Sequence, residues 1–112
     1  MKKVEAIIKP FMIDHVKGEL ERVGVSGLTI SEVRGVGRQR GHTELHRGAE
    51  YIIDFKPKMK LELIVRDEQV DGVVGAIMKS ARTGRIGDGK IYVLPLDEVV
   101  RIRTDERGNS AV

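Results

Sequence analysis

The sequence predicts an α+β fold of βαββαβ order, built as one domain over residues 1–112, and three observations support it. The chain is 40% hydrophobic, which suffices for one modest core but not for two. Four segments are predicted as strands, and three of them alternate apolar and polar residues with the two-residue period of a strand. Two further segments, each placed between strands, repeat apolar residues at the spacing of a helix.

The first part of the chain predicts a strand, a helix and a second strand. Residues 4–8 alternate in polarity, as on a strand with one buried face. After Pro10, apolar residues recur at helical spacing over 13–23, and Gly24 is suited to end this helix because glycine readily adopts the left-handed conformation found there. Residues 28–37 predict the second strand.

Residues 37–55 are predicted to form a long exposed loop. They carry many charged and polar side chains but few apolar ones, so they cannot bury themselves in a core. Loops of this length are uncommon in compact domains unless they have a function, which favours a binding element here.

The second half of the chain predicts a strand, a helix and another strand. Residues 59–65 alternate strictly and give the clearest strand. Helical spacing follows over 70–81, with Asp67 as the predicted N-cap because its carboxylate can accept an N–H group of the first turn. A glycine-rich loop over 82–90 leads to the last strand at 91–96.

Two arginines follow the last strand. Arg101 and Arg103 alternate with Val100 and Ile102, so we expect both arginines on one face of a strand. On their own they are also consistent with a solvated strand face. Residues 104–112 are polar and terminal, and we expect them to be a mobile tail in the absence of ligand.

The predicted order is that of the ferredoxin-like sandwich, in which both helices cover one face of an antiparallel sheet. The other face would mix isolated apolar groups with charged side chains, among them Lys3, Glu5, Lys60 and Glu62. Solvent covers such a face in many antiparallel sheets, and burial between subunits is the alternative.

The composition excludes several classes of site. Without cysteine, the chain has no disulfide, no thiolate metal site and no cysteine nucleophile. The net charge of +3 is small, so affinity for anions must come from local clusters. The segment MKKVEAIIKP is too short and too polar for a signal peptide or a membrane span, and we expect a cytoplasmic protein.

The segment TGRIGDGK at 83–90 is a candidate phosphate-binding loop. Its spacing approaches that of a P-loop, but Ile91 stands where a magnesium-binding Ser or Thr belongs, and the order here is helix, loop, strand. Gly84, Gly87 and Gly89 nevertheless leave successive N–H groups unshielded, as an anion nest requires. An ordinary turn is the alternative, since glycine suits turns.

A second glycine-rich basic segment, GVGRQRG at 35–41, fails the dinucleotide-binding pattern because Arg40 occupies the third glycine position and no helix follows. A solvated basic loop is the alternative here. Two glycine-rich basic loops together with Arg101 and Arg103 are, however, the combination that binding a triphosphate would require.

Other kinds of site have less support. His42 and His46 are four residues apart, but they lie in a segment without helical pattern and without an obvious third metal ligand. No set of nucleophile, base and orienting residue can be identified. RNA-binding domains of this order stack bases on aromatic residues of the two central strands, and these strands contain none, so direct nucleic-acid binding is a minor alternative.

Three separated motifs, GRQRGHTE at 37–44, RGAEY at 47–51 and TGRIGDGKIYV at 83–93, resemble the PII family of nitrogen-regulatory signal proteins. The resemblance extends from MKKVEAIIKPF to VVRIRT. It implies ferredoxin-like subunits that assemble as a homotrimer, with ATP or ADP bound between neighbouring subunits. The charged sheet face would then point toward the trimer interior.

The resemblance also implies the ligand-binding residues. The loop 82–90 would wrap the nucleotide phosphates, Arg101 and Arg103 would reach them from the adjacent subunit, and Thr29 and Ile64 would line the adenine side. The implied nucleotide-binding set is Ile7, Thr29, Gly35, Gly37, Arg38, Ile64, Thr83, Gly87, Asp88, Gly89, Lys90, Arg101 and Arg103. For 2-oxoglutarate the implied residues are Gln39, Lys58 and Gly41, where Lys58 pairs with a carboxylate and Gln39 helps to hold Mg²⁺.

The loop 37–55 matches the family's partner-binding T-loop. Tyr51 matches a tyrosine that is uridylylated in many bacterial members, although an unmodified contact residue is the alternative. Ala49 excludes the serine phosphorylation of cyanobacterial relatives, and His46 and Lys56 depart from the usual tyrosine and leucine. The implied function is a non-enzymatic sensor of ATP, ADP and 2-oxoglutarate. Its implied partners are a uridylyltransferase/uridylyl-removing enzyme, a glutamine synthetase adenylyltransferase, and a nitrogen-regulatory histidine kinase or an ammonium channel, which could recruit it to the membrane.

Overall fold

The computed structural model of the chain describes residues 1–40 and 51–112, and it describes side chains outside 37–54. Strands and helices alternate in the predicted βαββαβ order, and short 3-10 helices (η) precede both α-helices and close the chain. The elements are β1 (Lys2–Ile8), η1 (Pro10–Met12), α1 (Ile13–Arg22), β2 (Thr29–Arg40), β3 (Tyr51–Val65), η3 (Asp67–Gln69), α2 (Val70–Ala81), β4 (Lys90–Pro95) and η4 (Gly108–Ala111).

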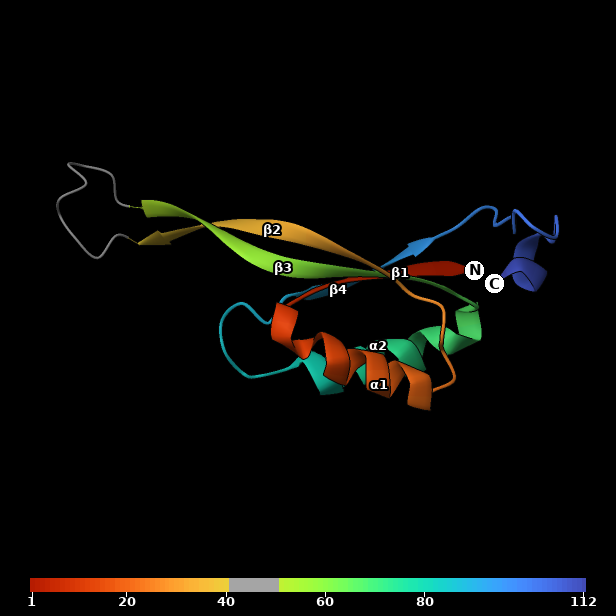
Figure 1. Cartoon of the computed structure of the whole chain (residues 1–112), viewed down its shortest axis with the longest axis horizontal. Coiled ribbons are helices and arrows are strands. Elements are labelled where there is room, and N and C mark those ends of the chain that lie inside the picture. The colour runs from red at the N-terminus through yellow and green to blue at the C-terminus, as the bar shows by residue number, and fades with distance from the viewer. Residues whose placement is uncertain (41–50) are drawn as a thin grey trace.

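The four strands form one antiparallel sheet in the order β2-β3-β1-β4, and α1 and α2 cover the same face of it (Figure 1). β1 pairs with β3 on one side and with β4 on the other, so Val4 lies opposite both Leu63 and Val93. This arrangement confirms the predicted ferredoxin-like fold.

The core lies between the sheet and the two helices. The helix-facing side chains of β1 and the buried ones of β3 are at most 1% exposed, because alternate residues of a strand point to the same face. The helices contribute side chains at helical spacing, and burying each large apolar group stabilises the fold by about 1.5–3 kcal/mol. The buried cluster comprises Val4, Ala6, Ile8, Val16, Leu20, Leu61, Leu63, Val65, Val73, Ala76, Ile77 and Ala81.

The first helix ends at the predicted glycine. Gly24 has a φ of +85°, which side chains with a Cβ rarely adopt. Its N–H donates to the Glu21 carbonyl at 3.0 Å, and the N–H of Val25 donates to the Leu20 carbonyl at 2.9 Å. These bonds satisfy carbonyl groups that the end of a helix would otherwise leave unpaired.

The opposite face of the sheet carries paired charges. Lys3 Nζ lies 2.7 Å from a Glu62 oxygen, and Lys60 Nζ lies 2.9 Å from a Glu5 oxygen. The hydrogen bond between Lys3 and Glu62 raises the pKa of Lys3 and lowers the pKa of Glu62, and the hydrogen bond to Glu5 raises the pKa of Lys60. The charges of this face are therefore paired between the neighbouring strands β1 and β3. Such a face is compatible with both of the predicted surroundings, solvent and another subunit.

The β2–β3 hairpin is longer than the sequence predicts. It forms an arm that leaves the rest of the molecule (Figure 1), and its register places Gly37 opposite Asp54 and Arg40 opposite Tyr51. Much of the predicted loop 37–55 is therefore strand, and only residues 41–50 lie outside the description. Cross-strand hydrogen bonds satisfy the backbone of such an arm, so the hairpin does not require a buried face. Its sequence therefore does not have to alternate apolar and polar residues.

The predicted N-cap of the second helix is wrong. The residue at the N-cap of α2 is Gln69, whose side chain makes no capping bond, while Asp67 begins η3. The Asp67 carboxylate accepts hydrogen bonds from the amino group of Met1 at 2.7 Å and from Lys2 Nζ at 3.2 Å, and both bonds lower its pKa. A long-range ion pair has thus replaced the local cap.

The strand predicted around Arg101 and Arg103 is also wrong. Residues 102–104 form a turn, in which the N–H of Asp105 donates to the Arg101 carbonyl at 2.9 Å. Four alternating residues are a weak strand signal, and in the described part of the chain they do not join the four-stranded sheet. An isolated bridge joins Val100 to Arg107, and η4 follows; the mobility of residues 104–112 stays a prediction. Within the described residues, no helix is long and apolar enough to cross a membrane.

Candidate functional site

The glycine-rich loop joins the end of α2 to the start of β4, and it has the backbone shape that its glycines allow. Gly84, Gly87 and Gly89 have φ values of +84°, +96° and +103°. These conformations turn the chain sharply and leave the backbone uncovered by Cβ atoms, as the predicted anion nest requires. The predicted helix, loop, strand order is confirmed, so the segment is not a Walker A motif.

The carboxylate of Asp88 organises this loop from within. It accepts hydrogen bonds from the N–H groups of Thr83 and Gly84, each at 2.9 Å, and from the Thr83 hydroxyl. Lys9 Nζ lies 3.1 Å from the same carboxylate. The hydroxyl bond, followed by the backbone bonds and Lys9, holds the pKa of Asp88 far below its usual range. Asp88 thus shapes the loop instead of presenting its carboxylate outward.

Two lysines approach the loop from the sheet. Lys58 Nζ, from β3, donates to the Gly87 carbonyl at 2.6 Å, and Lys9 Nζ, just beyond β1, donates to the Thr83 hydroxyl at 3.0 Å. The family resemblance implied a ligand-binding role for Lys58, but Lys9 was not selected from the sequence. The available signal was topological: because β1 and β4 are antiparallel, the residue that follows β1 must lie beside the loop that precedes β4.

The loop packs closely against β1 at one point. A Cβ atom built on Gly89 would lie 1.6 Å from the carbonyl oxygen of Ile7. Lys90, the next residue, pairs with Ile7 in the sheet. Glycine is therefore required at 89 for the loop to enter the sheet.

A hollow of about 420 Å³ adjoins the loop, between α2 and β4. It brings Ile7 together with Asp88, Gly89 and Lys90 of the predicted nucleotide-binding set. Its remaining lining is mainly apolar and consists of Ile8, Val74, Ile77, Met78, Ala81, Arg82, Ile91, Tyr92 and Val93.

The residues predicted for the adenine side lie elsewhere. Thr29 and Ile64 line a second hollow, of about 590 Å³, together with the C-terminal residues Ala111 and Val112. Lys3 lies opposite Ile64 in the sheet, and Ile7 follows Lys3 by four residues, or about 13 Å of strand. Within one chain, the hollow beside the loop and the hollow lined by Thr29 and Ile64 are therefore separate, although both contain residues predicted for the nucleotide site.

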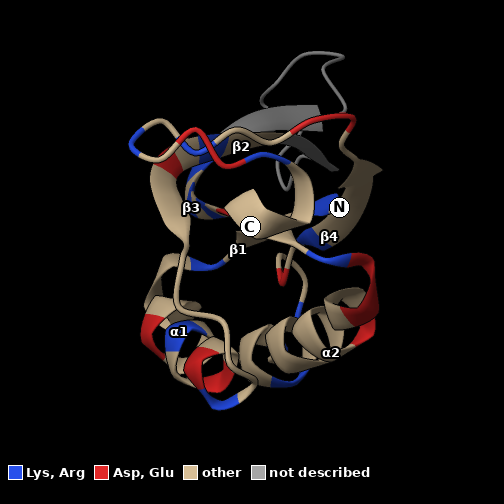
Figure 2. Cartoon of the chain, turned by 90° about the vertical axis from the view of Figure 1, so that its right-hand side faces the viewer, with Lys and Arg blue, Asp and Glu red and all other residues tan. Residues whose placement is uncertain are grey.

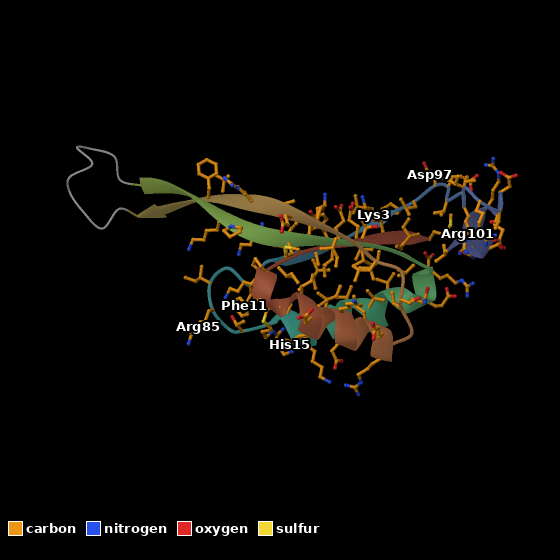
Figure 3. The ribbon with its side chains drawn as sticks, in the orientation of Figure 1. Lys3, Phe11, His15, Arg85, Asp97 and Arg101 are labelled. Atoms are coloured by element: carbon orange, nitrogen blue, oxygen red, sulfur yellow. The ribbon has the colours of Figure 1, made fainter. Side chains whose placement is uncertain are left out.

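The predicted arginine pair is also remote from the glycine-rich loop. Figure 3 shows Arg101 and the loop residue Arg85 on opposite sides of the two helices. Arg101 Nη2 donates to the Ala111 carbonyl at 3.5 Å, and its Nε lies 4.0 Å from Glu106. Figure 2 shows Lys and Arg mixed with Asp and Glu on the helices and along the C-terminal segment, so the charges of both signs are interspersed there.

The remaining predicted residues lie on or beyond the hairpin arm. Gly35 is next to Lys58, whose Cγ would be 3.5 Å from a Cβ at this glycine. Gly37, Arg38 and Gln39 belong to β2 and Tyr51 begins β3, with their side chains outside the description. Gly41, His42, His46 and Ala49 lie outside the described residues.

Comparison with known proteins identifies one family. The family model described as Nitrogen regulatory protein P-II matches residues 1–106. Curated proteins of the same description are similar along their whole length: 58% identity for that of Azospirillum brasilense, and 59% for those of Pasteurella multocida and Mesorhizobium japonicum. Each comparison covers 112 residues and 100% of both chains. On this similarity, and with the fold in agreement, the chain belongs to the PII family of nitrogen-regulatory signal proteins.

Proposed function

We propose that this nitrogen-regulatory protein is a non-enzymatic sensor that binds ATP or ADP at the 82–90 loop and 2-oxoglutarate beside it. The observation that carries the proposal is the convergence of Lys9 and Lys58 on a loop whose three glycines have positive φ. Backbone N–H groups of such a loop, together with ammonium groups, are the chemistry that binds phosphates.

The separation of the two hollows supports a nucleotide site completed by a second copy of the chain. Phosphates would bind at Gly87, Asp88, Gly89 and Lys90 of one subunit, with Thr83, Gly35, Gly37 and Arg38 nearby. The neighbouring subunit would supply Thr29 and Ile64 to the adenine and Arg101 and Arg103 to the phosphates. The self-neutralised face with its Lys3–Glu62 pair supports burial in a homotrimer, because it introduces no uncompensated charge.

Lys58 is the residue best placed to bind the carboxylate of 2-oxoglutarate. Its half-buried ammonium group already lies at the phosphate loop, on a neutral carbonyl that a carboxylate could replace. Gln39, on the arm that starts beside this loop, would help to hold Mg²⁺, with Gly41 contributing to the same ligand. The metal ion would supply positive charge that neutralises the phosphates and the 2-oxoglutarate carboxylate.

The output of the sensor would be the T-loop at the end of the hairpin arm. A ligand shifts this loop only through different affinities for its two arrangements, typically by about 1–3 kcal/mol. Its targets would be the adenylyltransferase of glutamine synthetase and a nitrogen-regulatory histidine kinase or an ammonium channel, which would bring this cytoplasmic protein to the membrane. A uridylyltransferase/uridylyl-removing enzyme would act on Tyr51.

Calorimetric titration of 2-oxoglutarate, with Mg²⁺ and with or without ATP, tests the proposal. We expect binding only when ATP is present, because the two ligands share one site. Binding that is indifferent to ATP, or the absence of binding in both cases, would overturn it.

A mixing experiment tests the shared site. Lys90→Ala chains would lack a phosphate contact, and Arg101→Ala/Arg103→Ala chains would lack the neighbour's contribution. After the two are unfolded and refolded together in equal amounts, about a quarter of the interfaces should combine an intact loop with an intact arginine pair. Recovery of ATP binding in this mixture but in neither variant alone is expected. A mixture that binds no better than its parents would show that the site is not shared.

A further inference from the structure

We propose that Lys9 is a positioning residue of the phosphate loop: it neutralises the Asp88 carboxylate and fixes the loop through Thr83, so that the site favours a polyphosphate. The inference rests on the proposed function, which it deepens by assigning a residue outside the set expected to touch the ligand. It follows from the contacts of three side chains.

The first step is the placement of Lys9. It follows the last residue of β1 and precedes Pro10, which begins η1, and its carbonyl accepts a hydrogen bond from the N–H of Met12 at 3.0 Å. Its backbone is therefore held on both sides. The side chain is only 16% exposed and reaches the loop with its Nζ 3.0 Å from Thr83 Oγ1 and 3.1 Å from Asp88 Oδ1.

The second step is the charge of Asp88. This carboxylate lies inside the segment whose N–H groups would face the phosphates, and it is needed there because it binds Thr83 and Gly84. A carboxylate without a cation at this place would repel every negative charge of the ligand. Among the side chains that the structure describes, Lys9 is the cation paired with Asp88.

The third step distinguishes Lys9 from Lys58. Lys58 donates to the Gly87 carbonyl, a neutral group, so its positive charge stays available to an anion. The charge of Lys9 is balanced by Asp88 at 3.1 Å. The two lysines therefore have different tasks, although both approach the same loop from the sheet.

Nucleotide titrations of Lys9→Met test this assignment. We expect binding of MgATP to weaken on the order of tenfold, MgADP less, and adenosine not at all, with smaller losses at high salt, because the effect is charge repulsion. Lys2→Met is the matched control: it removes an ammonium group at the other end of β1, away from the loop, where Lys2 Nζ pairs with Asp67 at 3.2 Å. This control should bind all three ligands as the wild type does.

Two further variants separate charge from packing. Lys9→Arg retains the cation and should keep MgATP affinity near that of the wild type. Lys9→Met/Asp88→Asn removes both charges while keeping an acceptor for the loop N–H groups, so it should bind MgATP better than Lys9→Met alone. A double variant no better than Lys9→Met, or equal losses for MgATP and adenosine, would overturn the assignment.

Amide hydrogen exchange without nucleotide tests whether Lys9 holds the loop in place. The N–H groups of Thr83 and Gly84 should exchange severalfold faster in Lys9→Met than in the wild type or in Lys2→Met. Unchanged exchange would overturn the positioning role. A wild-type protein that binds no nucleotide would instead overturn the proposed function and the ligand part of this inference, with the role of Lys9 in the loop still decided by the exchange rates.

Discussion

The ammonium group of Lys58 donates a 2.6 Å hydrogen bond to the carbonyl oxygen of Gly87 and thereby ties β3 to the glycine-rich loop. These residues are 29 positions apart in the sequence. A carboxylate that displaced this carbonyl from Lys58 would free the loop from β3, so under the proposed function this contact would couple ligand binding to loop conformation.

Replacing this lysine should separate the two ligands. We expect Lys58→Met to weaken 2-oxoglutarate binding by about tenfold or more, because a charge-assisted bond to a carboxylate is lost, and to change MgATP binding by less than about threefold. Calorimetry with each ligand measures both effects. Lys79→Met, which removes an exposed lysine of α2, is the control. Equal loss of both ligands would contradict the assignment of Lys58.

Gly89→Ala should destabilise the fold strongly. The new Cβ would lie 1.6 Å from the Ile7 carbonyl oxygen at a φ of +103°, so steric overlap adds to backbone strain. We expect a loss of about 3 kcal/mol or more in the free energy of unfolding, measured by urea denaturation. Gly84→Ala is the matched control, since its φ is +84° but its Cβ would meet nothing within 4 Å; about 1–2 kcal/mol is expected there. Similar losses for both variants would contradict the close approach at 89.

Acid should destabilise the protein partly through Asp88. Its bond to the Thr83 hydroxyl, together with the loop N–H groups and Lys9, keeps its pKa in the folded state far below its usual value. The unfolded chain therefore binds a proton at Asp88 more readily than the folded protein does. The stabilisation of the fold by ionised Asp88 is complete above about pH 5 and is lost progressively as the pH falls below about 4.

Urea denaturation at about pH 6 and about pH 3 should thus show a smaller difference for Asp88→Asn than for the wild type. Part of the acid sensitivity should remain, because the pKa values of Glu62 and Asp67 are lowered as well. Equal differences in the two proteins would exclude a contribution from Asp88.

Tyr51→Phe should prevent uridylylation without changing nucleotide affinity. The substitution removes the hydroxyl that would accept the uridylyl group, and Tyr51 lies on the arm, at the first residue of β3, far from the 82–90 loop along the strand. Intact-mass analysis after treatment with the cognate uridylyltransferase measures the adduct. An adduct that persists in the variant would place the modification on another residue.

The elements that the sequence predicted well are those whose pattern is imposed by the core. Burial of Val4, Ala6 and Ile8 enforces the alternation that identified β1, and burial of Val73 and Ile77 enforces the spacing that identified α2. The outer part of the β2–β3 arm is held by backbone pairing across the hairpin, which requires no alternating pattern of side chains.

The residues that sequence reasoning misplaced or missed depend on distant partners. Asp67 binds Lys2 across 65 positions, and Lys9 binds Thr83 across 74, so neither contact has a local pattern. The glycine loop was identified because its requirement is local: positive φ at Gly84, Gly87 and Gly89. Arg101 and Arg103 could be selected as a pair but not placed, since four alternating residues fit a turn as well as a strand.

One strand of the hairpin arm connects two of the predicted functional residues. Lys58, which contacts the glycine-rich loop, and Tyr51 both belong to β3 and are seven residues, or about 23 Å, apart along it. Because β2 and β3 are paired along this length, we expect the arm to rotate as a rigid body about the point where it leaves the sheet. A rotation of the arm by about 5° at Lys58 would move Tyr51 by roughly 2 Å. A small rearrangement around Lys58 would therefore cause a larger displacement at Tyr51, where the proposed modifying enzyme would act.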